Sequence, residues 1–153
     1  MTEPSILQRI QSDMTAAMKA QDADTLSTLR MLKTALMEAK TKKPRDASLT
    51  ADEEIEIVQR YAKKRREAIE EFRRVGREDV VAKEEAEIVI TQRYLPKALS
   101  EDELLVVIRE AIAKTGAASP KDMGKVIGVV MAQVKGQTDG GTVSRLVKQA
   151  LGS

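Results

Sequence analysis

Residues 50–76 read TADEEIEIVQRYAKKRREAIEEFRRVG, and this stretch decides the fold class. Thr50 is followed three residues later by Glu53, which predicts a capping box at the start of a helix. Gly76 is a natural end for that helix. Between them, apolar side chains recur every three or four residues, as on one helix face: Ile55, Val58, Tyr61, Ala62, Ala68, Ile69 and Phe72. The stretch therefore predicts one long amphipathic helix.

Helical spacing continues on both sides of this stretch within residues 1–94. A first helix after Ser5 carries Ile6, Leu7, Ile10, Met14 and Met18. A second helix, capped by Asp22 or Asp24, carries Leu26, Leu29, Leu32, Leu36 and Met37. A fourth, from about Asp79 to Tyr94, carries Val81, Ala82, Ile88 and Val89. Four amphipathic helices with short connections predict antiparallel packing.

Pro96 marks the boundary to a second helical region, because it disfavours a helical conformation at Leu95. Ser100 and Glu103 form another capping-box pattern, which opens a helix that stops at Gly116. Pro120 starts a helix that runs to about Lys135, and Thr142 is expected to cap a last short one. We therefore expect an all-α protein, with an N-terminal bundle of about four helices (residues 1–94) and a small three-helix C-terminal domain (residues 96–153).

The composition excludes several kinds of chemistry. The 153 residues include no Cys, His or Trp, so thiolate nucleophiles, Cys-ligated zinc and histidine-based triads are ruled out. Three aromatic residues are too few for a base-stacking sheet. We expect no cofactor, no metal site and no catalytic residue.

The net charge is only +2, so the positions of the charged residues are more informative than their sum. From Ala111 onward six basic residues face two acidic ones, a local excess of +4: Lys114, Lys121, Lys125, Lys135, Arg145 and Lys148 against Asp122 and Asp139. No apolar run of 18 residues is present, and the first residues lack the apolar core of a signal peptide. We expect a cytoplasmic protein that does not interact with membranes.

Residues 60–77 form a second basic region on the long helix. Six basic side chains share the face opposite the apolar one: Arg60, Lys63, Arg66, Arg73, Arg74 and Arg77. They could follow a phosphate backbone. The alternative, which we favour, is a solvated face with ion pairs between residues four apart: Glu56–Arg60, Lys63–Glu67, Arg66–Glu70 and Glu70–Arg74.

The helix after Pro120 carries the pattern that is hardest to explain by packing alone. Its projection places Met123, Val126, Ile127, Val130 and Val134 on one face and Gly124, Gly128 and Ala132 on the other. Lys121, Lys125 and Lys135 border the small residues. Each interior glycine costs about 1 kcal/mol relative to alanine, so close approach of another molecule is one explanation and close packing of a neighbouring helix is the other.

Several motifs together resemble the YqeY family over nearly the whole chain. They are Thr28–Lys33 (TLRMLK), Val75–Asp79 (VGRED), Tyr94–Leu104 (YLPKALSEDEL), Lys121–Gly128 (KDMGKVIG), Gly136–Thr142 (GQTDGGT) and Val147–Leu151 (VKQAL). The family shares its C-terminal domain with the tail of GatB, a subunit of the glutamine-dependent aspartyl/glutamyl-tRNA amidotransferase. The resemblance implies a two-domain helical fold and a tail that grips tRNA, without the catalytic parts of the amidotransferase.

We therefore expect a non-catalytic protein that binds tRNA or associates with a tRNA amidotransferase. The expected contact residues are the basic and small residues of the last two helices: Lys121, Gly124, Lys125, Gly128, Lys135, Arg145 and Lys148. One alternative is a protein–protein adaptor that docks another helix on the same stripe. A further alternative is an accessory component of a carbon–nitrogen ligase with glutamine as amido-N donor.

Overall fold

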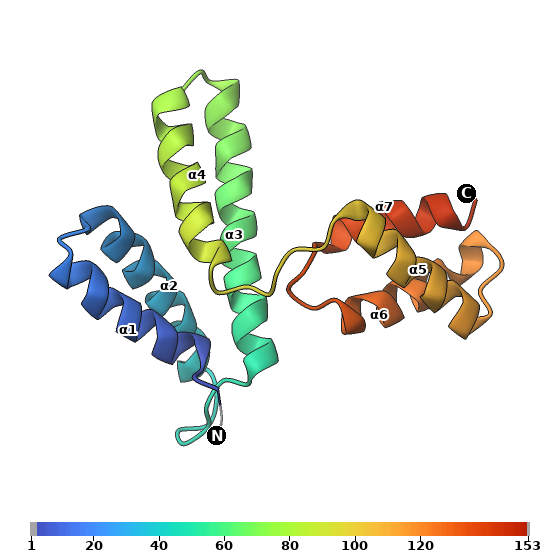
Figure 1. Cartoon of the computed structure of the whole chain (residues 1–153), viewed down its shortest axis with the longest axis horizontal. Coiled ribbons are helices and arrows are strands. Elements are labelled where there is room, and N and C mark those ends of the chain that lie inside the picture. The colour runs from blue at the N-terminus through green and yellow to red at the C-terminus, as the bar shows by residue number, and fades with distance from the viewer. Residues whose placement is uncertain (1–2, 153) are drawn as a thin grey trace. The chain divides into compact units, whose positions relative to one another are not determined.

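The computed structural model describes residues 3–152, and within them every regular element is helical (Figure 1). Contacts divide the chain into two compact units, one ending at Leu95 and the other beginning at Pro96. The first unit contains α1 (Ile6–Lys19), α2 (Ala23–Thr41), α3 (Ala51–Arg74) and α4 (Glu78–Gln92). The second contains α5 (Glu101–Thr115), a 3₁₀ turn η1 (Pro120–Asp122), α6 (Met123–Gln133) and α7 (Gly140–Ala150). The predicted all-α fold, with about four helices and then three, is confirmed.

The helix ends follow local side-chain chemistry. Capping boxes form at the starts of α1, α3 and α5, where Ser5, Thr50 and Ser100 accept from the backbone N–H three residues on. Gly116 ends α5 in the left-handed conformation, at φ 71°. The start predicted for α7 was wrong: Asp139, not Thr142, is the cap, because its Oδ1 accepts from the Thr142 N–H at 2.7 Å.

The N-terminal unit is made of two helical hairpins, α1 with α2 and α3 with α4 (Figure 1). Its main core is an apolar cluster that joins all four helices around Ile10, Leu29, Leu32, Leu36 and Val58. A smaller cluster of Ile69, Val81 and Ile88, with Phe72 against it, holds α3 to α4. The predicted hairpin-like arrangement of neighbouring helices therefore has two separate apolar clusters.

Four apolar side chains predicted to face the core lie on the surface instead. Met18, Met37 and Val89 are 60%, 38% and 59% exposed, and Ala82 is exposed as well. Helix α4 packs against α2 as well as α3, so its buried side chains are Val81, Ile88, Ile90 and Thr91. The spacing of apolar residues in the sequence indicates one apolar face of α4, and it does not reveal the second contact with α2.

A buried carboxylate joins α3 to α1. Glu54 is 3% exposed, and its two carboxylate oxygens accept from the backbone N–H groups of Ile6 and Leu7 at 3.1 and 2.9 Å. The first N–H groups of a helix have no partner within the helix, and the positive end of the helix dipole favours a negative charge there. Glu54 therefore anchors the start of α1 from a position 48 residues further along the chain.

Polar side chains also lie between α3 and α4. Arg65 pairs with Glu84 at 3.5 Å and lies over the ring of Tyr61, 5.3 Å from its centroid. Glu87 is the fourth member of this polar layer, and one of its carboxylate oxygens is buried without a hydrogen-bond partner in the described part of the chain. Burial and the neighbouring charge of Glu84 raise the pKa of the Glu87 carboxyl above its ordinary value.

The last aromatic residue before the unit boundary is fixed to α1. Tyr94 is 4% exposed, its hydroxyl donates to the Asp13 carboxylate, and the Arg9 guanidinium lies 5.1 Å from its ring centroid. Arg9 also donates to the Arg93 carbonyl at 3.0 Å. The pKa of Tyr94 is raised, first by burial and then by the hydrogen bond to Asp13. These contacts close the N-terminal unit directly before Leu95.

The C-terminal unit has one continuous core. Eight apolar side chains from its three α-helices and the C-cap residue of α6, Val134, form a single cluster: Leu104, Ile108, Ala111, Val126, Val130, Val134, Val143, Leu146 and Val147. The Leu99 N–H donates to the Gln137 carbonyl at 2.9 Å, which fixes the segment before α5 to the loop before α7. All three α-helices pack against one another.

Candidate nucleic-acid interface

The stripe of small residues predicted on α6 lies on its outer side. Val126, Val130 and Val134 are buried in the core, whereas Gly124, Gly128 and Ala132 are exposed. A Cβ atom built on Gly124 or Gly128 would meet no atom within 4 Å. The glycines therefore do not serve close packing of another helix inside this unit.

Lysines border this stripe at the positions that were expected from the sequence. Lys121 in η1 and Lys125 in α6 are exposed, and neither forms an ion pair within residues 3–152. Lys135 is exposed directly after the end of α6, at the residue following its C-cap Val134. The two nearby acids are engaged in local turns: Asp122 accepts from the Ala118 N–H, and Asp139 accepts from Thr142. The result is an exposed, smooth and positively charged helix face, here called the α6 face (Lys121, Gly124, Lys125, Gly128, Ala132 and Lys135).

The two basic residues predicted on α7 are exposed, but they differ in surroundings. Val143, Leu146 and Val147 form the buried side of α7, which leaves Arg145 and Lys148 on its outer side. Arg145 donates to the Glu101 carboxylate at the start of α5, so it lies toward α5 and its charge is balanced. Lys148 forms no ion pair in the described chain. Of the two, Lys148 is the residue whose charge is available to a phosphate.

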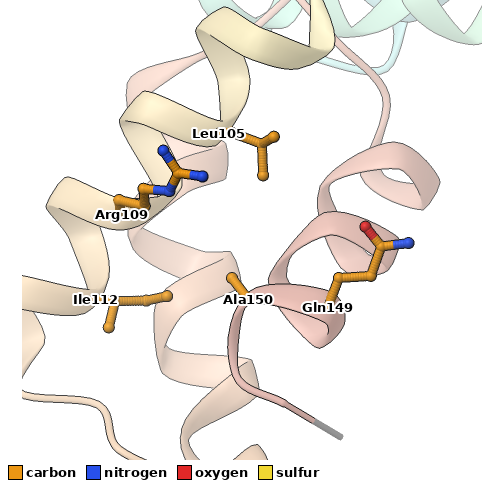
Figure 2. A pocket seen from close by; sticks show the side chains of 5 residues that line it. All are labelled: Leu105, Arg109, Ile112, Gln149 and Ala150. Carbon is orange, nitrogen blue, oxygen red and sulfur yellow. The ribbon is translucent and has the colours of Figure 1, made fainter.

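A shallow groove of about 510 Å³ lies between α5 and α7 (Figure 2). Leu105, Arg109 and Ile112 project from α5 toward α7, where Gln149 and Ala150 line the other side. Arg109 and Gln149 are exposed, and Leu105 and Ile112 are half-buried against the core. Sequence reasoning missed this groove, because its residues belong to two helices about 40 residues apart whose packing is not visible in a single helical projection.

The basic face of α3 is largely neutralised by carboxylates. The predicted Glu56–Arg60 pair forms at 3.5 Å. Arg74 pairs with Glu71 rather than Glu70, and Arg73 reaches across to Glu85 of α4 at 2.6 Å. The predicted pairs Lys63–Glu67 and Arg66–Glu70 do not form among the described residues, and Arg77 pairs with Asp79. Four of the six basic side chains on this face are therefore ion-paired, whereas Lys63 and Arg66 are not paired among the described residues, and the favoured interpretation stays a prediction.

Two further features are absent from the described residues. Residues 3–152 contain no group of three or more Asp, Glu, His or Cys that could hold a metal ion. None of the helices described is both long and apolar enough to cross a membrane.

The chain is thus an all-helical protein of two units, and the second unit carries the α6 face with its exposed glycines and lysines. Its sequence matches the model of the Yqey-like protein family over residues 7–151. The chain belongs to the YqeY-like family.

Two relatives are similar in sequence to this chain. The chain is 30% identical, over 99% of its own length and 83% of the relative's, to a Pyrenophora tritici-repentis protein named altered inheritance of mitochondria protein 41, mitochondrial. It is 31% identical, over 63% of its length and 77% of the relative's, to a Schizosaccharomyces pombe protein described as uncharacterized. The second match covers a smaller share of this chain than the first.

Proposed function

We propose that this protein binds tRNA through the α6 face of its C-terminal unit and does not itself catalyse a reaction. The observation that carries the proposal is the open space over Gly124 and Gly128, into which no part of the unit extends. Each helical glycine costs about 1 kcal/mol relative to alanine, and packing within the unit does not offset that cost. A partner that approaches the helix backbone closely would explain both positions.

The charges beside the glycines favour a phosphate backbone as that partner. Lys121 and Lys125 lie next to the smooth stripe without an acidic partner in the described chain, and Lys148 adds a charge on α7. Phosphate contacts supply most of the affinity of sequence-independent nucleic-acid binding. A helix face of this kind reads the shape of a folded RNA rather than its base edges.

The resemblance of the C-terminal motifs to the tail of the amidotransferase subunit supports tRNA as the RNA class. That resemblance also supports association with a tRNA amidotransferase as the setting in which the protein acts. The composition, which lacks His and Cys, supports a binding role rather than catalysis. The cytoplasmic location stays a prediction.

Two substitutions separate the steric and electrostatic parts of this proposal. Gly128→Leu blocks close approach and keeps every charge, and it should leave the fold intact because the space is empty. Gly128→Ala is its matched control and should bind tRNA more like the original chain. Both variants should be more stable than the original chain, because each removes most of the free-energy cost of a glycine inside a helix. Lys125→Ala should weaken tRNA binding and lower the slope of log affinity against log salt by roughly one.

Titrations of tRNA at several salt concentrations, beside thermal melts, measure these effects. Lys64→Ala on α3, which also removes an exposed lysine without an ion-pair partner in the described chain, is the control for net charge. Unchanged tRNA binding by both Gly128→Leu and Lys125→Ala would contradict the proposal. A partner bound with a shallow salt slope and lost in Gly128→Leu would favour a docking helix instead.

A further inference from the structure

We propose that the groove between α5 and α7 binds an amphipathic helix of another protein, with a carboxylate of that helix against Arg109. The groove has an apolar floor, made by Leu105 and Ile112 of α5 and Ala150 of α7 (Figure 2). This surface is separate from the α6 face, so the inference goes beyond tRNA binding and does not rest on it.

Charge identifies the chemistry of the occupant. Arg109 is exposed at the groove and has no ion-pair partner among residues 3–152, whereas Arg145 nearby on α7 is paired with Glu101. A guanidinium beside apolar side chains is suited to a two-pronged hydrogen bond with a carboxylate, which is stronger where water is excluded. Gln149, on the opposite side of the groove, offers an amide to the same partner.

The spacing of the groove residues fits a helix as the partner. Leu105, Arg109 and Ile112 lie at positions i, i+4 and i+7, which places them in one row along α5. An amphipathic helix presents its own apolar residues at the same spacing and lies in a groove between two helices. The charge of Arg109 falls in the middle of that row, so the expected partner carries Asp or Glu between apolar residues on its contact face.

RNA fits this groove less well than a protein helix does. The apolar floor offers nothing to a phosphate backbone. Of the three acids in the first turn of α5, Glu101 is paired with Arg145, whereas Asp102 and Glu103 form no ion pair among the described residues and repel a phosphate. The small C-terminal unit would thus present one helix face to RNA and a different groove to protein.

The experiment places the photoreactive amino acid p-benzoylphenylalanine at Gln149 of the full chain in cells, because this exposed residue lines the groove. The matched control places it at Gln11 of α1, which is also an exposed glutamine. After irradiation, the crosslinked peptides are identified by mass spectrometry. The expected result is a protein adduct at Gln149, absent at Gln11, whose attached peptide is an amphipathic helical segment with an acidic residue on its apolar face.

Arg109→Glu should lower the yield of that adduct about tenfold, since it replaces a charge-assisted hydrogen bond with a repulsion. Changing the partner's acidic residue to Lys should restore the yield with Arg109→Glu. Thermal melts and tRNA titrations of Arg109→Glu report separately on the fold and the α6 face. An adduct with RNA, an adduct with a second copy of this chain, no adduct, or a yield unaffected by Arg109→Glu would overturn the proposal.

Discussion

In the N-terminal unit three polar side chains are buried, Thr28, Glu54 and Thr91, whereas all buried side chains described in the C-terminal unit are apolar. Both threonines donate to the carbonyl four residues earlier in their own helix, so only Glu54 joins different helices. The first unit thus combines two apolar clusters with directional polar contacts, and the second relies on one apolar cluster. In the first unit a buried polar contact joins α3 to α1, whereas in the second unit the ion pair between α7 and α5, Arg145 with Glu101, is formed by exposed side chains.

The largest expected effect tests whether the two cores are independent. Ile108→Ala removes a fully buried side chain from the C-terminal core and should cost about 2–5 kcal/mol. Because that core belongs to one unit, amide hydrogen exchange should speed up in residues 96–152 and stay unchanged in residues 6–92. The matched change in the first unit is Leu32→Ala, which should have the reverse distribution.

Limited proteolysis of Ile108→Ala adds a second readout. Cleavage should increase after Leu95 and throughout the C-terminal unit, leaving a resistant N-terminal fragment. Equal loss of exchange protection in both units would show that the chain unfolds as one body and that the two cores are not independent.

The second effect tests the role of the buried carboxylate. Glu54→Ala leaves the N–H groups of Ile6 and Leu7 without their acceptor, and it should lower the free energy of unfolding by about 1–3 kcal/mol. Glu56→Ala, two residues further along α3, removes only an exposed pair with Arg60 and serves as the control. Urea denaturation of both variants measures the difference. If the two variants were equally stable, α1 would not depend on Glu54 for docking.

The smallest effect concerns pH and the polar layer of α3 and α4. The pKa of Glu87 is raised in the folded protein, so folding favours its protonated form. The stability that this proton contributes is present below the unfolded pKa of about 4.5 and is lost as pH rises through the raised value. Ionisation of this carboxyl, beside Glu84 and facing Arg65, Lys83 and Tyr61, should therefore weaken the hairpin as the pH rises.

Glu87→Gln keeps the size of the side chain and removes this ionisation. It should raise the thermal midpoint at pH 7 and make little difference at pH 3, where Glu87 in the original chain is protonated. Glu110→Gln, at an exposed position of α5, should change neither value appreciably. A lower midpoint of Glu87→Gln at pH 7 would mean that the Glu87 charge stabilises the layer.

Local signals in the sequence were sufficient for much of this fold. The capping boxes of Ser5, Thr50 and Ser100 join residues three apart, so they are visible without tertiary structure. The burial of Val89 could not be judged in this way, because it depends on α4 packing against α2 as well as α3. Glu54 was missed for the same reason, since its partners lie 48 and 47 residues away.

The candidate site shows the same limit. A helical projection separates Gly124, Gly128 and Ala132 from the valines of α6, but it does not say whether another helix covers them. Only the tertiary structure shows open space there. The pairing of Arg145 with Glu101, 44 residues apart, likewise follows from how α7 packs on α5. Which residues share a helix face was predictable, and which faces are covered was not.

The closure of the N-terminal unit by Tyr94 has a spectroscopic consequence. The chain has no tryptophan, and its two tyrosines, Tyr61 and Tyr94, both precede Leu95. Intrinsic ultraviolet fluorescence therefore reports on the first unit alone, while far-ultraviolet circular dichroism sees the helices of both. A thermal scan recorded by the two methods on the unmodified protein separates the melting of the two units, without a label or a truncation.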